Sequence, residues 1–170
     1  MQEQMKRWME TTKPSHFHRV LRRFIGEWKT TTSMWMDPAS PPMKSEGEAK
    51  YEWAVEGEWI RWQAVGQMMG QPSTSFGFLG YDNFKRKYVG ASITSDSTAL
   101  LHYEGSLDRT GNELLLWGPM DEPMTGEHDK PVRYHFKFQG KDKFVVEIHD
   151  LAIGGEKTKV LEMVHERKKG

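Results

Sequence analysis

The chain has 170 residues, and its 24 basic and 24 acidic side chains give a formal net charge of zero. Nucleic-acid binding is therefore not expected, because it needs a basic surface. The absence of cysteine excludes disulfides, thiolate nucleophiles and cysteine-ligated metal sites, and it fits a reducing compartment. Since the sequence has neither a run long enough to span a membrane nor the apolar core of a signal peptide, we expect a cytoplasmic protein without membrane insertion.

The N-terminal part of the chain predicts an arm followed by a short helix. Residues 1–13 form a polar N-terminal arm, in which Met5, Trp8 and Met9 recur at helical spacing. Residues 15–24 predict an amphipathic helix that Gly26 ends, and its apolar stripe consists of Phe17, Val20, Leu21 and Phe24. A single helix in a β-rich chain must bury its stripe, so we expect it to close one end of a single domain over residues 14–170.

The rest of the chain alternates strand patterns with turn residues. About ten strands are predicted, over residues 27–36, 43–53, 59–68, 75–81, 87–93, 98–107, 113–117, 132–138, 144–149 and 157–167. A longer loop is predicted at 118–130, where Gly118 and Pro119 interrupt the pattern. The other links are too short for parallel crossovers. The predicted fold is therefore all-β, an up-and-down antiparallel barrel of the lipocalin or fatty-acid-binding kind.

Two sets of residues resemble known families. The helix followed by Gly26-Glu27-Trp28 resembles the G-x-W signature of lipocalin-like (calycin) barrels. That resemblance implies that the tryptophan packs under an arginine of the last strand, and Arg167 is placed to fill this role.

The second set is more extensive and covers residues 26–168. Its segments occur in the same order in the bacterial domain-of-unknown-function 1579 family: Met34-Trp35-Met36-Asp37-Pro38 with Pro41-Pro42-Met43, Met68-Met69-Gly70, Gly80-Tyr81-Asp82-Asn83 with Lys87-Tyr88, and Asp121-Glu122-Pro123-Met124-Thr125-Gly126. Since that family is uncharacterised, the resemblance implies a fold and no activity.

The inward face of a ten-stranded barrel is the candidate binding site, because a barrel of this width can keep a cavity. Strand alternation and the enrichment in aromatic residues and methionine select candidate ligand-binding residues: Thr30, Thr32, Met34, Tyr51, Trp53, Arg61, Gln63, Met68, Tyr103, Tyr134 and Phe136. Val146, Ile148, Leu161, Met163 and His165 share the inward parity of their strands. The open mouth is expected among residues 36–43, 68–73 and 118–130.

The strand at 59–68 has two readings. If Trp59, Arg61, Gln63 and Val65 face inward, Arg61 places a cation in the lumen that would suit a carboxylate. If Ile60, Trp62 and Ala64 face inward, Arg61 lies in solvent and the aromatic residues are core.

No catalytic, metal-binding or cofactor-binding set is predicted. The sequence lacks a G-x-S-x-G elbow, a Walker loop and a dinucleotide fingerprint. His16 and His18 are two apart on a helix and make a poor chelate, His135 and His149 have the outward parity, and His165 is expected to be a hydrogen-bonded residue of the closed end.

The main hypothesis is a non-enzymatic barrel that binds a small hydrophobic or amphipathic molecule. One alternative is an isomerase-like or cyclase-like enzyme that uses Arg61 with tyrosine or histidine groups in the lumen. A second is a haem-binding protein. A third is a self-association module, a homodimer through exposed Trp35, Trp62 or Trp117.

Overall fold

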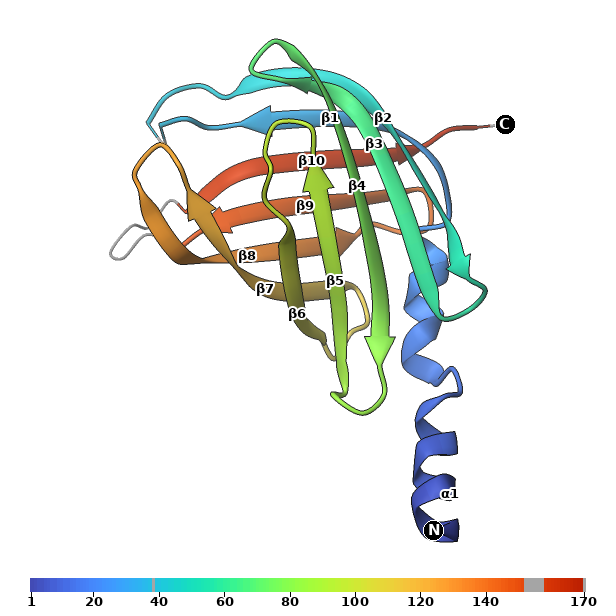
Figure 1. Cartoon of the computed structure of the whole chain (residues 1–170). Coiled ribbons are helices and arrows are strands. Elements are labelled where there is room, and N and C mark those ends of the chain that lie inside the picture. The colour runs from blue at the N-terminus through green and yellow to red at the C-terminus, as the bar shows by residue number, and fades with distance from the viewer. Residues whose placement is uncertain (38, 152–157, 170) are drawn as a thin grey trace.

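Ten antiparallel strands close into one barrel in the computed structural model, which describes residues 1–37, 39–151 and 158–169 (Figure 1). Each strand pairs with the next along the chain, and the last pairs with the first. The strands are β1 (Gly26–Met34), β2 (Met43–Val55), β3 (Trp59–Met68), β4 (Gln71–Asp82), β5 (Lys87–Thr94), β6 (Leu101–Leu107), β7 (Glu113–Glu122), β8 (Glu127–Phe138), β9 (Lys143–Asp150) and β10 (Lys159–Arg167). The predicted up-and-down barrel is confirmed. Pro38 and the predicted strand start at Lys157 lie outside the described residues.

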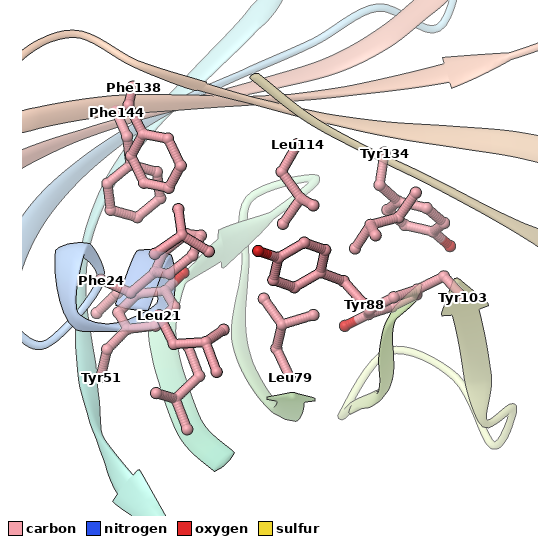
Figure 2. Close-up of a cluster of buried hydrophobic side chains, with 14 of the residues drawn as sticks. Leu21, Phe24, Tyr51, Leu79, Tyr88, Tyr103, Leu114, Tyr134, Phe138 and Phe144 are labelled. Carbon is pink, nitrogen blue, oxygen red and sulfur yellow. The ribbon is translucent and has the colours of Figure 1, made fainter. Parts of the chain in front are cut away.

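Two helical segments precede the barrel: α1 (Gln2–Thr11) and the 3₁₀ helix η1 (His16–Arg23). The predicted amphipathic helix lies where the pattern placed it, although its backbone is 3₁₀ rather than α. Leu21 and Phe24 at its end are fully buried, and Figure 2 shows them beside Phe138 and Phe144 of the barrel. This segment therefore closes one end of the barrel.

The N-terminal arm is the helix α1, and none of its residues is buried. It extends away from the barrel in Figure 1. Its junction with the domain is held by Asn83, whose side-chain amide donates hydrogen bonds to the carbonyls of Thr11 and Lys13 at 3.1 and 2.7 Å.

Trp28 and Arg167 complete the closed end, as the G-x-W resemblance implies. The Arg167 guanidinium carbon lies 4.1 Å from the centre of the Trp28 ring. Arg167 also donates hydrogen bonds to the carbonyls of Ile25 at 2.7 Å and Lys141 at 3.0 Å. One side chain therefore joins the last strand, the start of β1 and the β8–β9 turn.

The hydrophobic core fills the half of the barrel next to η1. Figure 2 shows Tyr88 between Leu79 and Leu114, with Tyr103 and Tyr134 further along the interior. The Tyr88 hydroxyl donates a 2.6 Å hydrogen bond to the carbonyl of Phe17, which ties the core to the closing helix. Burial raises the pKa of Tyr88, so the hydroxyl keeps its proton.

The predicted loop at 118–130 is wrong, because most of it is strand. β7 and β8 continue as a long hairpin with Pro119 opposite Pro131. The pairing of β7 with β6 covers Leu114 to Trp117 and stops before Pro119, so this proline is not required to donate to β6. Pro119 therefore interrupts the alternating strand pattern in the sequence, although β7 continues through it to Glu122.

Candidate ligand-binding lumen

A cavity of about 300 Å³ occupies the half of the barrel that the core leaves open. It lies at the end opposite η1, because its lining residues come from the strand ends far from that helix, such as Thr32, Met68, Ser73 and Leu161. Cavities of this size and larger are typical of small-molecule sites.

The inner end of the cavity is an aromatic floor, made of Tyr51, Trp62, Tyr103, Tyr134 and Phe136. The Tyr103 and Tyr134 rings lie 4.7 Å apart, and the Tyr51 and Trp62 rings are stacked at 6.1 Å. These rings present flat apolar surfaces to whatever enters the lumen.

Two glycines make room for this floor. A Cβ atom at Gly77 would collide with the Trp62 ring, and one at Gly90 would collide with the Tyr103 ring. Each ring therefore lies against the backbone of the neighbouring strand rather than standing out into the lumen. The positions of these glycines are a sequence signal for flat aromatic side chains inside the barrel.

His165 is the histidine of the lumen, at its inner end. Its Nδ1 lies 3.3 Å from the Met163 carbonyl, which can only accept, so Nδ1 is the donor of that hydrogen bond. Its Nε2 then accepts a hydrogen bond from the Tyr51 hydroxyl, also at 3.3 Å. Burial lowers the pKa of His165 to about 3 and raises that of Tyr51, so both groups are neutral near pH 7.

Nearer the mouth, hydroxyl side chains line the cavity wall and form what we call the hydroxyl collar. The collar consists of Thr32, Ser45, Ser73, Ser75, Ser92 and Thr94. The carboxylate of Asp96 at the rim accepts hydrogen bonds from the hydroxyls of Ser73 and Thr94. Among the described residues, no lysine or arginine lines the cavity. The lumen therefore offers hydroxyl donors and acceptors and no positive charge.

Arg61 and Gln63 do not lie in the lumen, because β3 turns Ile60, Trp62 and Ala64 inward. The Arg61 guanidinium binds the Glu52 carboxylate at 2.6 Å on the outer surface. Hydrogen bonds from Lys50 and Arg61 lower the pKa of Glu52. The expected cation for a ligand carboxylate is thus paired outside the barrel.

Seven of the predicted ligand-binding residues line the cavity: Thr30, Thr32, Tyr51, Met68, Tyr103, Tyr134 and Phe136. Met34 and Trp53 do not, and Trp53 packs against the hydrophobic core. The inward parity assigned to Val146, Ile148, Leu161, Met163 and His165 also places them in the lining. Of the three segments expected at the mouth, 68–73 contributes Met68 and Ser73, while no described residue of 36–43 or 118–130 lines the cavity.

A second hollow, of about 670 Å³, lies on the outer surface beside β6 and β7. Lys87, Glu104 and Asp129 are among its walls, and Lys87 already pairs with Glu104. It is an open groove whose lysine is already paired, so the lumen is the stronger candidate site.

The fold and cavity define a ten-stranded barrel with a closed end and an accessible lumen. The chain belongs to the family described as "Protein of unknown function (DUF1579)", whose model matches residues 13–167, as the sequence resemblance implied. No curated protein matches the sequence.

Two solved structures share the fold. Rv2717c from M. tuberculosis has 15% identity and a TM-score of 0.68, with 92% of this chain and 100% of that chain covered. The S-type phycobiliprotein lyase CPES from Guillardia theta has 13% identity and a TM-score of 0.57, with 89% and 92% covered. Among the described residues, no helix has the length and apolar character needed to cross a membrane.

Proposed function

We propose that this protein binds a small hydrophobic or amphipathic molecule in the lumen. The observation that carries this proposal is the cavity of about 300 Å³ with apolar and aromatic walls at its inner end and hydroxyls nearer its mouth. An apolar body would lie on the aromatic floor and a polar end would lie at the hydroxyl collar.

The lining favours a polar end without negative charge. A carboxylate in a partly closed cavity needs a cation or several donors to offset its lost hydration. The described lining has no lysine or arginine, and Asp96 at the rim would repel an anion. Hydroxyl, carbonyl or ammonium groups suit this collar better.

A matched series of ligands tests the proposal. We expect 1-decanol to change the intrinsic tryptophan fluorescence saturably, since Trp62 lines the lumen, and decanoate to bind more weakly than decanol or decylammonium. No response to any of the three would contradict binding in the lumen. Tightest binding of decanoate would contradict only the preference for an uncharged or positive end.

The phycobiliprotein lyase neighbour makes a bilin a useful further probe, although likeness at 13% identity supports the fold alone. Bilins carry carboxylates, so weak binding is the expected outcome. Saturable binding tighter than that of decanol would instead favour a tetrapyrrole ligand.

The enzyme alternative receives less support from the lumen chemistry. Efficient proton transfer needs a group with a pKa near the working pH. The pKa of His165 is lowered to about 3 and that of Tyr51 is raised, so neither group exchanges protons readily near pH 7. Arg61, which that alternative requires, lies on the outer surface.

The haem alternative would depend on His165, the histidine in the described lining. Its two ring nitrogens are engaged by Met163 and Tyr51, so an iron would have to displace the Tyr51 hydroxyl. Absence of a Soret band after haem is added would exclude this alternative.

Self-association through tryptophan loses one of its three candidates, because Trp62 lies in the lumen. Trp117 is 46% exposed, with the Arg133 guanidinium 5.8 Å from its ring centre. A homodimer through Trp35 or Trp117 and a cytoplasmic location stay predictions, and light scattering tests the oligomeric state.

A further inference from the structure

Three potential metal ligands meet on the outer face of the barrel, on the opposite side of the β8–β9 wall from the cavity. His135 of β8 lies across from Glu147 of β9, and His149 follows two residues later. One ligand atom from each lies within 4.8 Å of the others. The three side chains are only 12–13% exposed, so they are held in place by their surroundings while remaining open to solvent.

The hydrogen bonding of His135 turns Nδ1 toward Glu147. Its Nε2 lies 2.8 Å from a Glu113 carboxylate oxygen, which can only accept, so Nε2–H is the donor of this hydrogen bond. The second ring nitrogen, Nδ1, lies 4.0 Å from Oε2 of Glu147. Nδ1 is therefore the atom of His135 that can serve as a metal ligand beside Glu147.

His149 completes the set from the other side. Its Nε2 lies 3.1 Å from the same Glu147 oxygen, and its Nδ1 lies 3.0 Å from the Thr158 hydroxyl. A hydroxyl can donate or accept, so Thr158 can hold His149 in either tautomer. Histidines that bind metals typically form a hydrogen bond with an outer partner through their second ring nitrogen. Glu113 is this partner for His135, and Thr158 is this partner for His149.

Lys137 now provides the positive charge at this point. Its Nζ lies 2.9 Å from Oε2 of Glu147, whereas Lys159 lies 3.6 Å from the other oxygen and 2.6 Å from Glu162. The Lys137 side chain is 34% exposed, so this flexible ammonium group can withdraw into solvent and leave Oε2 of Glu147 to another cation.

We propose that His135, Glu147 and His149 form a binding site for a divalent transition metal, with zinc the best match. Two imidazoles and one carboxylate with an open fourth position are a ligand set that zinc accepts. Binding draws the three ligand atoms together and displaces the Lys137 ammonium from Oε2. This metal site is independent of ligand binding in the lumen, because none of its three residues lines the cavity.

Calorimetric titration of the untagged protein with Zn²⁺, and with Co²⁺ followed by its visible absorption, tests this site. We expect one ion per chain. His149→Gln should weaken binding by at least about 100-fold, and Glu113→Gln, which alters only the outer partner of His135, by about 10–100-fold. Lys137→Met should tighten binding by about tenfold or more, because it removes the competing charge.

His128→Gln is the matched control, since His128 lies at the opposite end of β8 from His135 and pairs with Asp121. It should leave the affinity unchanged, and thermal melting without metal checks that every variant folds. Equal affinity in wild type and a folded His149→Gln variant would overturn the proposal, as would Lys137→Met binding no more tightly. Loss of binding in His128→Gln would show adventitious surface binding instead.

Discussion

Trp28 connects the closing helix, the first strand and the last strand through one side chain. It is 1% exposed, its indole Nε1 donates a 2.8 Å hydrogen bond to the Phe24 carbonyl, and Arg167 stacks on its ring. Phe144 packs edge-on at 4.7 Å. Trp28 does not itself line the cavity and meets its lining only through the His165 ring, whose centre lies 6.4 Å away, so we expect Trp28 to serve stability rather than binding.

Replacing Trp28 with alanine should lower the free energy of unfolding by about 3–5 kcal/mol, through a cavity and the lost contacts. Urea denaturation measures this change. Trp117→Ala at a half-exposed position on the barrel exterior is the control and should cost far less. A Trp28→Ala variant that kept its stability but lost a ligand would show that the closed end had been assigned to the wrong side.

His165 should make stability depend on pH. Its pKa is lowered to about 3 in the folded protein by burial, so between that value and about 6.5 the unfolded chain binds more protons. Its contribution is therefore fully present above about pH 6.5 and is lost as pH falls, by up to about 1.4 kcal/mol per unit. His149, whose pKa is also lowered by burial, acts in the same direction.

A comparison of His165→Gln with the wild type separates the contribution of His165 to the pH dependence of stability from that of His149. The variant should lose stability less steeply between pH 6 and pH 4, as measured by urea denaturation at each pH. Identical slopes for the two proteins would mean that His165 is protonated in the folded state.

At the scale of elements, the two N-terminal helical segments have opposite roles. Because α1 has no buried residue and the Asn83 contacts involve Thr11 and Lys13, deletion of residues 2–10 should change the free energy of unfolding by less than about 0.5 kcal/mol. Leu21→Ala in η1 should cost about 2–5 kcal/mol, since Leu21 is fully buried. A large loss of stability on deleting the arm would contradict an independent α1 and the boundary at residue 13.

β3 shows where strand alternation stops being informative. Register shifts between Trp53 and Val55, so β2 has one extra residue opposite Trp59 and Ile60. A bulge of this kind reverses the parity carried across a hairpin, and no residue type marks it. The sequence therefore left two orientations of β3 open, and the one with Arg61 outside is found.

Where the pairing is regular, the sequence was sufficient. β9 and β10 have a register shift between Lys159 and Leu161 but pair without interruption from Leu161 to Glu166, and there the apolar parity placed Val146, Met163 and His165 on the face that lines the lumen. The group of His135, Glu147 and His149 could not be seen from parity alone. It depends on the β8–β9 register, and on outer partners from β7 and from Thr158.

At the scale of the molecule, the barrel is divided along its axis. The end next to η1 is filled by side chains such as Phe24, Phe144 and Leu114, whereas the opposite end holds the cavity. The sequence predicted the number of strands, the closure of the sheet into a barrel and the helix that closes one end. The cavity's charge did not, because it depends on which side of β3 faces inward.

Calorimetric titration of 1-decanol into the wild type, Ala64→Trp and Gln63→Trp tests the central claim most directly. Ala64 lines the lumen, and its neighbour Gln63 faces outward on the same strand. We expect the wild type and Gln63→Trp to bind equally, and a folded Ala64→Trp variant to lose binding because the indole fills the cavity. Unchanged binding by Ala64→Trp would place the ligand outside the lumen and contradict the account.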